Sequence, residues 1–235
     1  RPVIFATPGN NKACLKAFKA HLEQYGGDSK KVTEAVSDMS SAFVPAIKEE
    51  FKKARLTVDW FHVVKQFSSA LEEVRRSEQK QEGFPKYIRW AALKGEEKAK
   101  TEKQQQALEE LRTSGFATAT AYRVKELLRW IRHATSEQSA KWRITHFINY
   151  AQTLVEDDPL LKPVLKALNT VKKHAASIAS RWASNHTNAR LEGLNSLFQA
   201  AKARARGYRN ERTFITMIYL IGAPIDTFLD GLIRG

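Results

Sequence analysis

Strand-forming residues are confined to one part of this sequence. Residues 32–36 and 55–59 read as two short strands, and apolar residues at helical spacing precede, separate and follow them up to about residue 76. Helices that alternate with strands through short connections are typical of parallel strands in an α/β layer. From about residue 77 to 184 the periodicity predicts successive helices and no strand. We therefore expect an α/β piece plus a large all-α block, in a predominantly helical chain.

The charge balance favours an anionic partner. The chain has 235 residues, with 39 Lys and Arg against 25 Asp and Glu, and a formal net charge of +14. An excess of this size favours nucleic acid over an acidic membrane. We recognise no membrane-spanning run and no signal peptide, so we expect a cytoplasmic protein. The single cysteine, Cys14, excludes an intrachain disulfide and a cysteine-rich zinc site.

Helical periodicity also marks the segment that begins at Asn188. It has an apolar stripe of Leu191, Leu194, Phe198, Ala201 and Ala205, and a polar stripe of Asn188, Glu192, Asn195, Gln199, Lys202 and Arg206. We expect Asn188 to cap this helix and Gly207 to end it. Glu192 then lies in the first turn. At that position a carboxylate has two possible roles. It is stabilised by the positive end of the helix dipole, or it holds a metal ion beside a phosphate chain.

Two further acids follow the predicted strands. Asp38 comes just after residues 32–36, and Asp59 ends the run 55–59. Active groups in parallel sheets lie at the carboxyl ends of strands. Together with Glu192, these carboxylates are the hard oxygen ligands that Mg²⁺ accepts, and a pair of such ions can assist phosphoryl transfer. Spacing alone is weak evidence, because 25 acids allow many such triples.

Several segments carry a resemblance to a known family. They are Val36-Ser37-Asp38-Met39-Ser40 with Phe43, Thr57-Val58-Asp59-Trp60-Phe61-His62-Val63-Val64-Lys65, Glu73-Val74-Arg75-Arg76, Asn188 with Leu191-Glu192-Gly193-Leu194-Asn195-Ser196, and Lys202-Ala203-Arg204-Ala205-Arg206-Gly207-Tyr208-Arg209. In these motifs and their order, the sequence resembles the DDE transposases of bacterial insertion sequences. The narrower resemblance is to the branch typified by insertion sequence L-three. The C-terminal motifs are the most specific.

The resemblance implies an RNase H-like core fragment interrupted by a helical insertion. The implied divisions are core residues 1–67, an all-α insertion at 68–184, and a returning catalytic helix with a C-terminal helix at 185–235. The first catalytic acid of the family has no counterpart before Asp38. We therefore expect this chain to be the C-terminal part of a catalytic core, inactive by itself.

The resemblance also implies the site residues. Asp38 and Glu192 match catalytic acids that would hold Mg²⁺ or Mn²⁺, and Asp59 with His62 matches a D-x-x-H motif that supports the site. Two alternatives stay open. Asp59 could complete a triad with Asp38 and Glu192, and His62 could be a packed residue hydrogen-bonded to Asp59.

The implied activity is DNA cleavage and strand transfer at transposon ends. Its partner would be the double-stranded DNA of the ends and the target, in a bacterial, nucleoid-associated protein, with a homodimer or higher oligomer left open. The residues expected to contact DNA are Lys202, Arg204, Arg206, Arg209, Arg123, Arg129, Lys172 and Lys173. The alternative activity is that of a non-catalytic DNA-binding remnant or regulator of transposition. For the basic residues at the end of the predicted helix, the alternative is a solvent-exposed helix end whose positive charges are stabilised by the helix dipole.

Overall fold

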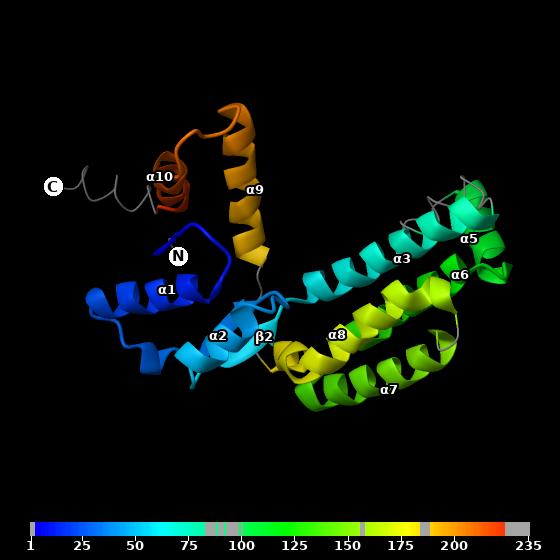
Figure 1. Ribbon diagram of the computed structural model, residues 1–235. Helices are drawn as coiled ribbons and strands as arrows, with labels where there is room; N and C mark the ends of the chain where they lie inside the picture. Colours follow the sequence, from blue (N-terminus) through cyan, green and yellow to red (C-terminus); the bar gives the residue numbers. More distant parts are fainter. Residues whose placement is uncertain are drawn as a thin grey trace. The chain divides into compact units, whose positions relative to one another are not determined.

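The computed structural model describes residues 3–82, 88, 92, 99, 101–155, 158–183 and 189–223. In chain order its elements are α1 (Lys12–Gln24), η1 (Ser29–Lys31), β1 (Glu34–Ser37), α2 (Phe43–Glu50), β2 (Arg55–Val58), α3 (Trp60–Glu82), α5 (Glu102–Thr113), α6 (Ala117–Arg132), α7 (Glu137–Val155), η3 (Pro159–Leu161), α8 (Lys162–Ala179), η4 (Ser180–Trp182), α9 (Ala189–Arg204) and α10 (Glu211–Gly222) (Figure 1). These residues are predominantly helical, as the sequence predicts.

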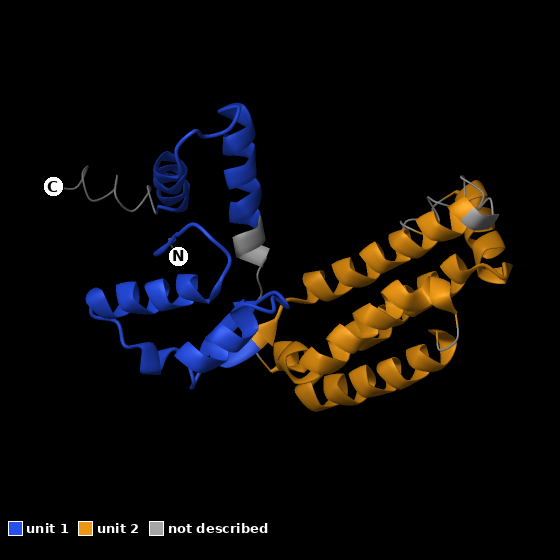
Figure 2. Ribbon diagram, viewed as in Figure 1, with its two compact units in different colours: residues 1–56, 186–235 blue, residues 57–185 orange. Residues whose placement is uncertain are grey.

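The chain divides into two compact units (Figure 2). Unit 1 comprises residues 1–56 and 186–235, and unit 2 comprises residues 57–185. The division into core and insertion, at residues 67 and 184, remains a prediction, because a compact unit is not by itself evidence of common ancestry.

The predicted order of helix, strand, helix, strand and helix is present at the start of the chain. Within the described residues, β1 and β2 form a two-stranded parallel sheet, and the backbone N–H of Arg55 donates to the carbonyl of Thr33 at 2.7 Å. β1 begins two residues later than predicted. The reason is a short capped turn, because Asp28 accepts from the Lys30 N–H at 2.8 Å and Val32 closes η1. An RNase H-like core remains a prediction.

Unit 1 contains an apolar cluster around the two strands. Its buried residues are Val44, Ile47 and Leu56, with Leu15, Ala35 and Phe43 packed against them. The N-terminal segment joins two helices, since Ala6 N–H donates to the Tyr219 hydroxyl of α10 at 2.9 Å. Phe5 meanwhile contacts the rings of Phe18 and His21 of α1 at 5.7 and 5.0 Å.

Unit 2 contains a bundle of α3, α6, α7 and α8 in which each helix contacts two of the other three, and α5 also contacts α6 (Figure 1). Large apolar side chains at helical spacing fill its centre. Phe67 of α3 meets Phe147 of α7 edge to face at 5.6 Å, and both rings are almost fully buried. Helices predicted from periodicity in the second half of the chain are thus found, and their apolar stripes pack together as expected for antiparallel neighbours.

One buried carboxylate caps a helix of unit 2. Glu78 on α3 is only 1% exposed and accepts hydrogen bonds from the backbone N–H groups of Ala117 at 2.5 Å and Thr118 at 3.0 Å. These groups open α6, whose own N-cap residue, Phe116, provides no side-chain cap. The first N–H groups of a helix have no partner within it, so Glu78 takes the place of a local cap.

A second carboxylate of α3 is bound by two arginines. Glu72 accepts from Nε of the buried Arg75 at 2.8 Å, from NH2 of the same residue at 2.9 Å, and from Nε of Arg76 at 2.9 Å. The hydrogen bond from Arg75 is the main reason that the pKa of Glu72 is lowered from 4.5 to about 2. The folded chain therefore binds this proton more weakly than the unfolded chain does. The resulting stability is present above pH 4.5 and is lost as the pH falls towards 2.

We expect Glu72→Gln to lower the free energy of unfolding by about 1–2 kcal/mol at pH 7, because a charged hydrogen-bond acceptor is lost. The difference from wild type should shrink as the pH falls from 4.5 towards 2. Urea unfolding at several pH values measures it. Glu73→Gln is the matched control, since Glu73 is exposed on the same helix. A difference that does not depend on pH would contradict the role of the Glu72 charge.

Candidate functional site

Asp38 lies directly after β1 and is half-buried. Its Oδ1 accepts from the backbone N–H of Ser40 at 3.0 Å and from the Ser37 hydroxyl at 3.5 Å. Ser40 then accepts from the N–H groups of Ala42 and Phe43, both at 3.3 Å, at the start of α2. The hydrogen bonds of Asp38 within the described residues use Oδ1 only. Oδ2 is therefore the oxygen left to bind a ligand.

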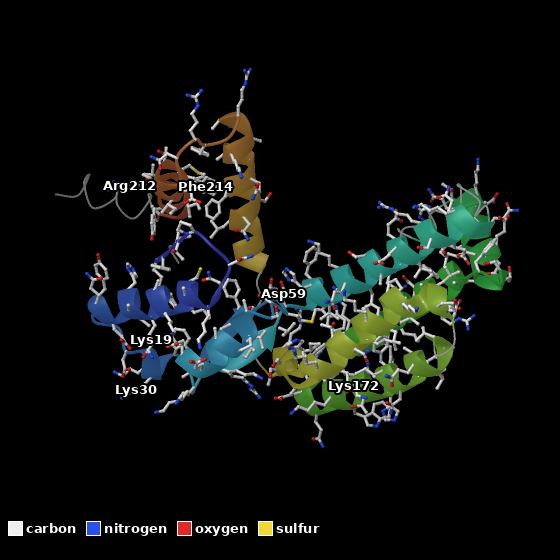
Figure 3. All side chains as sticks on the ribbon, in the orientation of Figure 1. Lys19, Lys30, Asp59, Lys172, Arg212 and Phe214 are labelled. Atoms are coloured by element: carbon white, nitrogen blue, oxygen red, sulfur yellow. The ribbon has the colours of Figure 1, made fainter. Side chains whose placement is uncertain are left out.

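Asp59 directly follows β2 and is only 6% exposed (Figure 3). Its Oδ1 accepts from the Phe61 N–H at 3.2 Å, a local turn like the one at Asp38. Its Oδ2 lies 3.4 Å from Nδ1 of His62, whose side chain is 34% exposed. Neither of these two buried atoms has a hydrogen-bond partner among the described residues. The pair is therefore close, but it lacks the well-formed hydrogen bond that a packed histidine would need.

Glu192 lies in the first turn of α9. Its side chain, that of Leu191 and the whole of Asn188 lie outside the described residues. That Glu192 and Asp38 together hold a metal ion thus remains a prediction. Asp38 supplies a hard oxygen atom of the kind that Mg²⁺ takes. In the described part of the chain, which omits the Glu192 side chain, no group of three His, Cys, Asp or Glu residues is placed to hold a metal ion.

The rest of α9 agrees with the predicted stripe only in part. Phe198 is buried, but Ala205 is exposed because α9 ends at Arg204. The N–H of Gly207 donates back to the Lys202 carbonyl at 2.9 Å, and Gly207 has a φ of +94°. Gly207 therefore ends the helix as predicted. Arg206 also adopts a positive φ, of +53°, which the sequence did not indicate.

The basic residues predicted to contact DNA are all solvent-exposed. Those of unit 1 are Lys202, Arg204, Arg206 and Arg209, and those of unit 2 are Arg123, Arg129, Lys172 and Lys173, with Lys172 on α8 in Figure 3. Arg129 lies 3.4 Å from Glu126, and the ammonium group of Lys202 lies 5.7 Å from the centre of the Phe214 ring. Exposure leaves the charges accessible to a polyanion. In the part of the chain that the structure describes, no helix is long and apolar enough to cross a membrane.

Comparison with known proteins shows the family to which this chain belongs. A model of the ISL3-type DDE transposases, described as a transposase family, matches residues 1–218. The chain belongs to this family. The resemblance inferred from the motifs around Asp38, Asp59 and Glu192 is thereby confirmed at the level of the family.

A curated relative of this transposase chain is the transposase for insertion sequence element IS1001 of Bordetella parapertussis. The two are 23% identical over 232 residues, which cover 93% of this chain and 54% of the relative. The chain thus spans about half the length of that relative. No solved structure matches this chain.

Proposed function

We propose that this transposase chain contributes Asp38 and Glu192 to a metal-dependent site that cuts transposon ends and joins them to target DNA. One observation carries the proposal: Asp38 directly follows a strand of a parallel pair, and its hydrogen bonds within the described residues use only one of its two carboxylate oxygens. When bound there, Mg²⁺ or Mn²⁺ would activate the attacking oxygen and stabilise charge on the phosphate. The test is cleavage of transposon-end DNA by a transposase that contains this chain together with the first catalytic acid. Variants of Asp38 and Glu192 in that protein are expected to lose most of the activity.

Asp38 and Asp59 would have different roles. Both accept a backbone N–H two residues further along the chain, but Asp38 is half-buried and Asp59 is almost fully buried. A buried carboxylate beside a histidine is better suited to position the start of α3 than to meet a phosphate. We therefore assign Asp59 and His62 as positioning residues of the site.

The exposed basic residues would hold the DNA backbone. Contacts of this kind position a protein on DNA without reading its sequence. The net charge of +14 supports the same role. When these positively charged side chains bind phosphates, counterions are released from the DNA. The affinity for DNA should therefore depend steeply on salt concentration.

We expect Lys202→Gln with Arg204→Gln to reduce the slope of log affinity against log salt by about 2, since each phosphate contact contributes about 0.9. Titration of duplex DNA at several salt concentrations, followed by fluorescence anisotropy, measures the slope. The matched control is Lys30→Gln with Lys31→Gln, which removes the same charge from exposed residues of unit 1. Equal effects of the two pairs would show that only overall charge matters and would reject a specific basic surface on α9.

A further inference from the structure

One helix of unit 2 presents a row of exposed rings. Trp142, His146 and Tyr150 recur at every fourth position of α7 and so share one face of the helix. Trp142 is 54% exposed and Tyr150 is 51% exposed, and His146 is also exposed. The buried side of α7 is made by other residues, including Ile144, so the bundle does not need these rings for its core. Clustered exposed aromatic residues of this kind mark interaction sites.

Trp130 of α6 joins this row. Its ring lies 5.5 Å from that of Trp142, and the Trp142 ring lies 4.0 Å from that of His146. The guanidinium of Arg143 lies 5.3 Å from the centre of the Trp130 ring and donates to the Trp130 carbonyl at 2.6 Å. We call Trp130, Trp142, His146, Tyr150 and Arg143 the aromatic face. The rings of Trp130, Trp142 and His146 contact one another, and Arg143 lies against that of Trp130, so little conformational entropy is lost when a ligand stacks on these three rings.

A groove continues from the aromatic face along α6. It has a volume of about 400 Å³, and Trp130, Tyr122 and Leu127 give it an apolar lining. Arg112, Arg123 and Glu126 also line it. Because the two guanidinium groups outnumber the one carboxylate, this apolar groove suits a ligand that has a flat ring and a negative charge.

Charge identifies the class of partner. Within α6 and α7 the basic residues are Arg123, Lys125, Arg129, Arg132, Lys141 and Arg143, whereas the acids are Glu126 and Glu137. A second copy would bring the same excess of positive charge to the same face, and like charges repel. A polyanion is attracted instead. A nucleic acid is a polyanion that also carries flat rings.

We propose that the aromatic face binds unpaired bases of single-stranded DNA. The choice of DNA rests on the proposed function, whereas the preference for unpaired bases rests on the rings. Bases in a duplex are stacked on one another and cannot offer their faces to exposed side chains. Unpaired bases can, and each base that stacks on an aromatic ring contributes about 1–3 kcal/mol of binding. Arg143 lies beside the rings, where a phosphate of the same strand can contact it.

The test compares the affinity of the 235-residue chain for a short oligothymidylate with its affinity for a duplex of the same length, by fluorescence anisotropy. We expect Trp142→Ala and Tyr150→Ala each to weaken single-strand binding by about 5- to 100-fold. Duplex binding should change by less than about twofold, and Trp142→Phe should retain most of the single-strand affinity because a ring remains. The matched control is Tyr25→Ala in unit 1, which removes a ring that is 76% exposed and lies 4.7 Å from the ring of His21.

Three results would overturn the proposal. Single-strand affinity could be unchanged in both alanine variants, or single-strand and duplex affinity could fall equally, which would indicate phosphate contacts only. The third is a dimer, measured by sedimentation velocity, that Trp142→Ala converts to monomer without changing single-strand binding, which would make the face a contact between copies. The single-strand preference is independent of transposon-end cleavage. A failure here is thus distinct from a failure of the proposed function.

Discussion

In a transposase that contains this chain together with the first catalytic acid, Asp38→Asn is expected to lower cleavage of transposon-end DNA by about a thousandfold or more. The substitution keeps the oxygen that accepts the Ser40 N–H at 3.0 Å, so the local turn should persist. It removes the negative charge needed to hold a divalent cation, and with it the stabilisation of charge in the transition state. Gel analysis of end-labelled DNA in Mg²⁺ or Mn²⁺ measures the loss. Affinity for the same DNA in the absence of a divalent metal should remain unchanged.

Asp28→Asn is the matched control, because Asp28 is exposed and accepts the Lys30 N–H in a similar turn at 2.8 Å. Glu192→Gln should match the loss in Asp38→Asn, and its control is Glu211→Gln in the first turn of α10. We expect Asp59→Asn to cost only about 10- to 100-fold, as is typical of residues that position a metal ligand. An equal loss in Asp59→Asn would place Asp59 among the metal ligands. Near-normal cleavage by Asp38→Asn would reject the proposed site.

Glu78→Ala is expected to lower the free energy of unfolding of unit 2 by about 3–5 kcal/mol. The substitution leaves two buried N–H groups at the start of α6 without an acceptor, and each costs about 1–3 kcal/mol. Water cannot easily replace the carboxylate, because Glu78 is only 1% exposed. Urea unfolding followed by circular dichroism measures the change.

The same helix offers both a milder variant and a control. Glu78→Gln keeps one acceptor oxygen but loses the charge at the positive end of α6, and should cost about 1–2 kcal/mol. Glu73→Ala changes an exposed residue of α3 and should stay within about 0.5 kcal/mol of wild type. If Glu78→Ala were as stable as Glu73→Ala, Glu78 would not be the cap of α6.

The elements were predictable where local sequence decides them. Asn210 caps α10 by accepting the Arg212 N–H at 2.8 Å, and Asp158 accepts the Leu160 N–H at 2.8 Å where the next helical segment begins. Apolar periodicity likewise predicted the helices of unit 2. The cap of α6 was not predictable, because Glu78 and Ala117 are 39 residues apart in sequence. The start of β1 was placed too early, because Val32 favours a strand but instead closes the turn capped by Asp28.

The candidate site was predictable in outline only. Strand order indicated that Asp38 and Asp59 would each follow a strand, and both do. Sequence gave no indication that Asp59 is almost fully buried while Asp38 is half-buried, since this depends on packing. The aromatic face was also missed. Trp142 and Tyr150 lie on the face of α7 opposite the buried Ile144, so helical spacing is the signal that could have shown that these rings are exposed.

The central claim is that Asp38 and Glu192 hold the same metal ion. Iron-directed cleavage tests it without requiring transposition. Fe²⁺ that replaces Mg²⁺ is oxidised by added hydrogen peroxide, and the hydroxyl radicals formed cut the polypeptide next to the ligands of the ion. We expect cuts beside both Asp38 and Glu192, and we expect Asp38→Asn and Glu192→Gln each to abolish both cuts together. Cuts beside Glu192 that persist in Asp38→Asn would contradict a shared site.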